Sequence, residues 1–250
     1  MANTTLSPLH RADGSARYTK NGYSVIAAVN GPIEVQRRDE LPEEAAVDVA
    51  VRPAAGLGGL PERHLESILQ NTLRHVIVVS AHPRTLIQFT LQIVTSPGDD
   101  SVTGSLPQAS SNLPVLPALL QASILALLST SIPLFMTLTA TLVAVNPNGI
   151  LLVEPSVQEI KLASSIHVLA FSSHGDLLVV ESEGDFTIDK WEEVHKKAKS
   201  ICHEEAGDES ESGSEDVSMS SDDSSKIENV LKEAVERKIA KEQRWKESTG

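Results

Sequence analysis

The residues from Ser101 to Val153 include no charged side chain, and this gap constrains the fold more than any other feature of the chain. So apolar a stretch either enters a membrane or forms the core of a globular domain. A membrane-spanning helix needs about 20 consecutive apolar residues and is usually flanked by Lys or Arg. Here no Lys or Arg flanks the stretch, and it is interrupted by Pro107, Pro114, Pro117, Gln121, Ser123, Ser129, Ser131 and Pro133. We therefore expect a soluble, intracellular domain whose core contains this segment.

Composition limits the core and the partners. Of the 250 residues, 40% are hydrophobic but only 3% are aromatic, so the core must consist of Leu, Val, Ile and Ala. The single cysteine, Cys202, excludes an internal disulfide and a cysteine-based zinc site. The net charge is −13, yet nine acids and no base lie between Glu204 and Asp223, so the remainder is close to balanced. Charge therefore neither supports nor excludes RNA binding.

The hydrophobic pattern predicts a mixed α/β domain over residues 1–203. Ile87, Phe89, Leu91 and Ile93 alternate with polar residues, which is typical of a strand with one buried face. Residues 118–128 are apolar on nearly every side, which predicts a buried helix. The other expected strands are 22–30 with a turn at 30–32, short strands at Ile33–Val35 and Val47–Val51 around a loop at 36–44, then 76–80, 138–145, 149–153, 166–171 and 177–181. The other expected helices are one around Leu65–Leu73 and one at 190–203 capped by Asp189, and residues 98–112 are expected to form a loop insertion.

The C-terminal region has a different composition. Residues 204–225 are almost entirely Glu, Asp, Ser and Gly, so we expect an acidic disordered linker. An apolar stripe among Lys and Glu then predicts an amphipathic helix over residues 226–246 that folds on docking. Ser212 and Ser220 each have an acid three residues later, a pattern that favours acid-directed kinases. A plain solubilising tail is the alternative interpretation.

Other catalytic motifs are missing from the sequence. Gly56-Leu57-Gly58-Gly59 is followed by Pro61 where a dinucleotide loop needs its third glycine, so it indicates a flexible turn. There is no nucleophile elbow, no zinc-protease helix motif and no P-loop. We expect no cofactor, no metal and no catalytic residue.

Several short sequence motifs, in their order along the chain, resemble those of the ribonuclease PH family. They are Arg11-Ala12-Asp13-Gly14-Ser15, Val29-Asn30-Gly31-Pro32-Ile33-Glu34, His82-Pro83-Arg84-Thr85-Leu86-Ile87, Ala122-Ser123-Ile124-Leu125-Ala126-Leu127 and Ser131-Ile132-Pro133. The resemblance covers about Leu9 to Cys202. It implies an α/β (α+β) domain, the two-layer fold of the ribosomal protein S5 domain 2-like type, and assembly into six-membered rings.

Active members of that family degrade RNA from its 3′ end with inorganic phosphate, and this chain departs from them at the residues concerned. The family's Gly-Thr-Arg phosphate loop falls at Pro114, Val115 and Leu116, with no cation nearby in sequence. Of the family's two acids, six residues apart, the first is Glu154 and the second position is Ile160. Glu159 is adjacent, but we expect it in an extended segment, where its side chain points the other way.

These departures resemble those of the non-catalytic ring subunits of the eukaryotic RNA exosome, of the forty-six type. The resemblance implies a structural role in 3′–5′ RNA processing and decay, including rRNA maturation, in the nucleus, nucleolus and cytoplasm. The implied partners are other ribonuclease PH-like subunits, RNA-binding cap subunits, a separate catalytic ribonuclease and RNA, with no membrane. The candidate RNA contacts are Arg37, Arg38, Arg63 and Arg84.

A residual 3′-exoribonuclease, phosphorolytic or hydrolytic, is the alternative. It would use Glu154 and Glu159, because paired carboxylates can hold Mg²⁺ and assist a displacement. Two solvated acids at the end of a strand are the simpler interpretation of the same residues.

Overall fold

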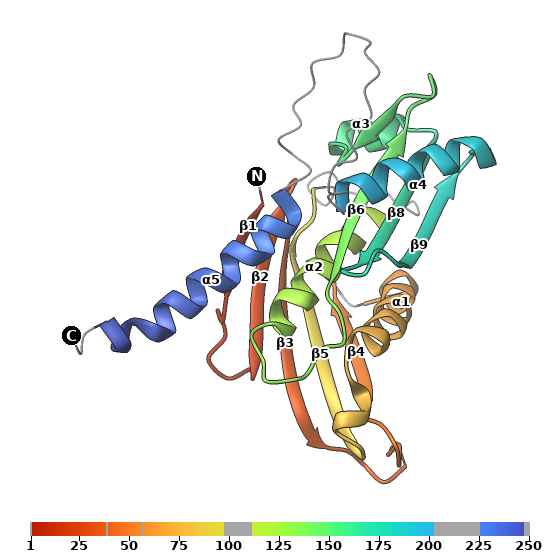
Figure 1. Cartoon of the computed structure of the whole chain (residues 1–250). Coiled ribbons are helices and arrows are strands. Elements are labelled where there is room, and N and C mark those ends of the chain that lie inside the picture. The colour runs from red at the N-terminus through yellow and green to blue at the C-terminus, as the bar shows by residue number, and fades with distance from the viewer. Residues whose placement is uncertain (1, 39, 57, 98–111, 203–225, 248–250) are drawn as a thin grey trace.

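The computed structural model describes residues 2–38, 40–56, 58–97, 112–202 and 226–247 (Figure 1). The expected insertion at 98–112, apart from Asn112, and the acidic linker at 204–225 lie outside the described residues. No helix in the described ranges is long and apolar enough to cross a membrane.

Two sheets form the framework. A five-stranded sheet has the order β1-β2-β3-β5-β4, in which β4 and β5 are parallel and the other neighbours antiparallel. Its strands are β1 (Asn3–Leu6), β2 (Gly14–Lys20), β3 (Tyr23–Glu34), β4 (Ala46–Arg52) and β5 (Thr85–Thr95). An antiparallel four-stranded sheet has the order β7-β6-β8-β9. Its strands are β6 (Leu138–Val145), β7 (Leu151–Val153), β8 (Ser165–Ser172) and β9 (Leu177–Gly184).

Helix α2 (Leu116–Leu127) joins the two sheets. It packs against β2 and β3 of the larger sheet and against β6 of the smaller one. Eleven of its residues are buried, which explains why the sequence is apolar on nearly every side. Most of the charge-free segment described here thus forms the core, as the sequence predicts.

The other helices cover the sheets (Figure 1). Helix α1 (Leu60–Val76) packs on β4, α4 (Ile188–Cys202) packs on β6 and β8, and α5 (Lys226–Glu247) contacts β1. The short α3 (Val157–Leu162) follows β7 in the chain. Among residues 231–244 of α5, Leu231 and Ala234 are the most buried, with 6% and 7% exposed.

Close packing explains the glycine at position 14, in the Arg11–Ser15 motif. A side chain at this position would collide with Thr130 and with the carbonyl oxygen of Ala126, at the end of α2. The neighbouring Ser15 N–H donates to Ser129 Oγ over 2.9 Å. Only a glycine lets β2 approach the end of α2 this closely.

Several predicted boundaries are wrong. The expected turn at 30–32 is an irregularity within β3, which continues to Glu34 because it resumes pairing with β5 at Ile33. The expected strand at 76–80 is the end of α1 followed by a 3-10 helix (Val79–Ala81), because the Ile77 N–H still bonds to Leu73. Asp189 lies inside the first turn of α4 and does not cap it.

Candidate functional site: a small pocket between the two sheets

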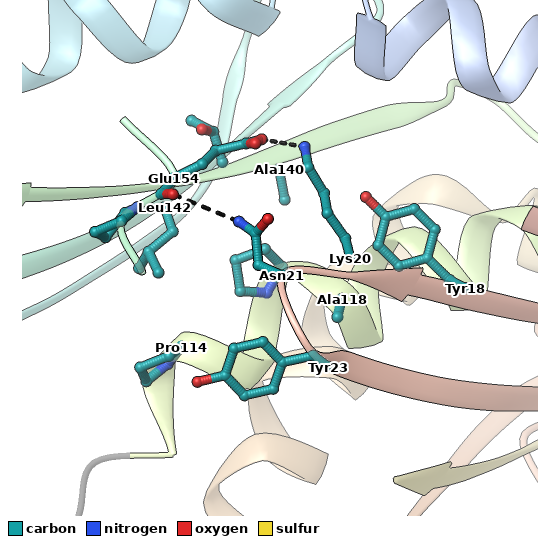
Figure 2. Close-up of a pocket in the computed structure, with 12 residues that line it drawn as sticks. Tyr18, Lys20, Asn21, Tyr23, Pro114, Ala118, Ala140, Leu142 and Glu154 are labelled. Atoms are coloured by element: carbon teal, nitrogen blue, oxygen red, sulfur yellow. Dashed lines mark hydrogen bonds and ion pairs between the residues drawn. The ribbon is translucent and has the colours of Figure 1, made fainter. Parts of the chain in front are cut away.

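A small pocket lies where the two sheets and the start of α2 meet (Figure 2). Its volume is about 40 Å³, which is room for a few water molecules. The wall nearest α2 and β6 is largely apolar. The twelve lining residues include Tyr18, Lys20, Asn21, Tyr23, Pro114, Ala118, Ala140, Thr141, Leu142 and Glu154.

The polar side of this pocket is an ion pair between Lys20 and Glu154 (Figure 2). Lys20 is the last residue of β2, and Glu154 follows β7, so they are 134 residues apart in the chain. Their side chains are 18% and 27% exposed. The sequence indicated no cation near this site, and the structure corrects that view: one is present, but its charge is matched by the carboxylate.

The backbone around Glu154 fixes the direction of its side chain. Its φ angle is 51°, a left-handed conformation uncommon for a residue with a side chain. The Glu154 N–H donates to Leu142 O over 2.8 Å, and Asn21 Nδ2 donates to Glu154 O over 3.5 Å. These bonds tie the end of β7 to β6 and to the β2–β3 turn.

The positions expected to match the family's phosphate loop are buried. Pro114 and Val115 lie in a 3-10 helix (Leu113–Val115), and Leu116 begins α2. All three are buried, and Leu116 is completely inaccessible. A cationic side chain at Leu116 would therefore enter the hydrophobic core and could not reach solvent.

The second acidic position is also unsuited to catalysis. We expected Glu159 in an extended segment, and this was wrong, because it is in α3. Ser156 and Glu159 form a capping box, in which Glu159 Oε2 accepts from the Ser156 N–H over 2.6 Å. These hydrogen bonds from Ser156 lower the pKa of Glu159. Ile160 is half-buried against the main core.

The donors present do not fit a divalent metal ion. Such ions take several oxygen ligands. Glu154 is paired with Lys20, Glu159 caps its own helix, and Ile160 has no donor atom. In the described ranges, no three His, Cys, Asp or Glu residues gather in a way that could hold a metal.

Neither tyrosine of the pocket is poised to ionise. Burial raises the pKa of Tyr18, and the charge of Glu154 raises it further. Burial also raises the pKa of Tyr23. Both phenols therefore stay protonated at neutral pH and can act as hydrogen-bonding groups only.

The four candidate RNA-contacting arginines are exposed and fall into two groups. Arg37 and Arg38 are in the β3–β4 loop, and Arg84 is bonded to that loop through Leu41 O and Glu44 O. Arg84 Nε also lies 3.4 Å from Glu40 Oε1, so it is an ion-pair partner. Arg63 is in the first turns of α1, beyond the opposite end of β4.

Comparisons with known sequences identify relatives of this chain. The sequence model for domain 1 of the 3′ exoribonuclease family, RNase PH, matches residues 3–133. The exosome complex component RRP46 of Saccharomyces cerevisiae is 32% identical over 203 residues, covering 78% of this chain and 87% of the relative. The Schizosaccharomyces pombe protein with the corresponding name is 35% identical over 126 residues, half of each chain.

Solved structures support the same fold. The crystal structure of rice Rrp46 has a TM-score of 0.73 at 23% identity and covers 94% of both chains. A chain of the Archaeoglobus fulgidus exosome, solved with RNA bound to the active site, has a TM-score of 0.64 at 14% identity and covers 81% of this chain and 85% of that one. These likenesses show the fold alone. With the sequence matches, they lead to one conclusion: the chain belongs to the RNase PH family of 3′ exoribonucleases.

Proposed function

We propose that this chain is a non-catalytic structural subunit of the RNA exosome core ring. In that role it would support 3′–5′ RNA processing and decay, including rRNA maturation. Two relatives named as exosome components support the assignment to this assembly. The alternative of a residual nuclease is not favoured.

The observation that carries the proposal is the burial of Pro114, Val115 and Leu116. Attack by phosphate on a phosphodiester brings negative charges together, so an active site must supply fixed positive charge. Here the phosphate-loop positions are buried apolar residues, and the nearby ammonium group of Lys20 is matched by Glu154. Loss of a single oxyanion donor already costs roughly 10²–10³ in rate. A chain without the arginine and without the second acid is expected to have no measurable phosphorolysis.

The residual nuclease would need Glu154 and Glu159 to act on one metal ion or one water molecule. Each carboxylate is instead engaged elsewhere, by Lys20 and by the start of α3. The simpler interpretation, two solvated acids at the end of a strand, is wrong as well, because Glu154 is largely buried in an ion pair and Glu159 lies in the capping box of α3.

The proposed partners are other ribonuclease PH-like subunits in a six-membered ring, RNA-binding cap subunits, a separate catalytic ribonuclease and RNA. The proposed location is the nucleus, nucleolus and cytoplasm. Exposed apolar side chains are available for contacts between subunits, among them Leu60 (80% exposed), Phe135 (67%), Leu162 (70%) and Ile188 (75%).

Affinity purification of the tagged native protein, followed by quantitative mass spectrometry, tests this role. We expect other ribonuclease PH-like subunits in equal amounts, and none from an untagged control. Fluorescence microscopy of the same tagged protein tests the three compartments. A chain recovered alone, or only as copies of itself, would contradict the proposal.

A further inference from the structure

A second, more open hollow lies away from the pocket beside Lys20 and Glu154, on the loop between β1 and β2. It is lined by Pro8, Leu9, His10, Arg11 and Ala12, with Asn30 of β3. Its volume is about 540 Å³. Because it opens widely to solvent, it can admit part of a polymer.

The loop around this hollow is held rigidly by its own bonds. The Ser7 N–H donates to Ser15 O over 2.7 Å, and the Leu9 N–H donates to Ser15 Oγ over 3.0 Å. Ser15 is in turn fixed to the end of α2 through Ser129. A binding loop that is already ordered loses little conformational entropy when a ligand arrives.

The hydrogen-bonding side chains in the hollow are left available. Within the described part of the chain, the side chains of His10, Arg11 and Asn30 make no hydrogen bond or ion pair. The acid of this loop, Asp13, turns its carboxylate to the Gly31 N–H, where Oδ2 accepts over 2.9 Å. The guanidinium group of Arg11, which is exposed, is therefore not neutralised by its neighbour.

Other cations lie beyond the hollow, where β3 ends and β5 begins. In the β-ladder, Gly14 at the start of β2 is opposite Val29, whereas Thr85 at the start of β5 is opposite Glu34, further along β3. Arg84 immediately precedes β5, and the β3–β4 loop carries Arg37 and Arg38. The hollow is therefore separated from these arginines by the last residues of β3.

We propose that the hollow formed by residues 8–12 and Asn30 binds the phosphodiester backbone of single-stranded RNA. Arg11 contacts a phosphate, the amide of Asn30 donates a second bond, and Leu9, which is 41% exposed, offers an apolar wall to a sugar or base. This inference rests on the proposed role in RNA metabolism, but it concerns a surface separate from the pocket beside Lys20 and Glu154.

The salt dependence of RNA binding tests this site. Binding of fluorescein-labelled oligo(U) is measured by anisotropy across a range of salt concentrations, with the purified ring that contains the full chain. The slope of log K against log salt is negative, and for single strands each lost phosphate contact makes it shallower by about 0.7. We expect Arg11→Gln to make the slope shallower by about that amount. We expect Asn30→Asp to weaken binding at every salt concentration. The matched control is Lys197→Gln, an exposed cation on α4, which should leave the slope unchanged.

The result that would overturn this site differs from failure of the proposed function. If the ring assembles and binds RNA but Arg11→Gln and wild type share one slope, the hollow does not contact RNA. The same conclusion follows if an acidic phosphopeptide displaces a label attached near Arg11 while oligo(U) does not, because the site would then recognise protein. If no ring is recovered with the wild-type chain, the proposed function itself has failed.

Discussion

At the scale of single residues, Lys20 and Glu154 contribute to stability as a pair. Because both side chains are mostly buried, removing one partner leaves the other's charge poorly solvated. We expect Lys20→Met or Glu154→Gln to lower the free energy of unfolding by about 1–3 kcal/mol, between the values for exposed and fully buried pairs. The double variant should regain most of this loss. Urea denaturation of all four proteins measures the coupling, and additive losses would contradict it.

His167 makes the stability of the fold depend on pH. Its ring is buried in β8, with Nε2 3.0 Å from Ser165 Oγ and Nδ1 2.8 Å from Ser182 Oγ. Burial lowers the pKa of His167, so the unfolded chain holds the proton more tightly than the folded protein. Its contribution to stability is therefore complete above the unfolded pKa of about 6.5 and is lost as pH falls through the folded value. The urea midpoint should therefore fall as the pH is lowered from about 6.5, and it should fall less in His167→Gln. An equal dependence of the midpoint on pH in the two proteins would contradict this.

An arginine placed where the sequence analysis expects the family's phosphate-loop arginine should not create activity. Leu116 is completely buried, so Leu116→Arg places an unpaired cation in the core and is expected to cost at least about 4 kcal/mol of stability. Thermal unfolding and a phosphorolysis assay measure both effects. The matched control is Leu116→Met, which should fold normally. A stable Leu116→Arg protein that degrades RNA would contradict this expectation.

At the scale of elements, strict periodicity made prediction reliable. The alternation of apolar and polar residues predicted the strand β5, and the all-round apolar character of residues 118–128 predicted the buried helix α2. Both elements are found. The sequence predicted neither β1 nor β2, whose residues mix polar and apolar types. It also missed α3, although Ser156 and Glu159 have the spacing of a capping box. Lys20 was missed because only the folded chain brings β2 beside the end of β7.

The contact between β2 and α2 is sensitive to a single methyl group. Gly14→Ala must displace Thr130 or the end of α2, so we expect a loss of about 1–3 kcal/mol, the usual cost of overpacking. Gly56→Ala is a useful comparison, because its added methyl group meets nothing nearby, although its φ of 80° adds strain. Thermal melts compare the variants. A Gly14→Ala protein as stable as wild type would contradict the close packing.

At the scale of the whole molecule, helix α5 docks on the body of its own chain. Leu231 and Ala234 join the main hydrophobic core, and Lys238 Nζ donates to Ser129 O over 3.1 Å. We expect Leu231→Ala to lower the free energy of unfolding by about 2 kcal/mol or more. Glu236→Ala, on an exposed position of the same helix, should change it by less than about 0.5 kcal/mol. Equal effects of the two substitutions would mean that α5 is not docked.

The most direct test of the central claim is a phosphorolysis assay on the isolated chain. Labelled RNA is incubated with the purified protein, inorganic phosphate and Mg²⁺, and released nucleoside diphosphates are measured beside the Glu154→Gln variant. The account predicts no release above background from either protein. Release of nucleoside diphosphates by the wild-type chain, abolished in Glu154→Gln, would contradict it and make the pocket beside Lys20 and Glu154 a working active site.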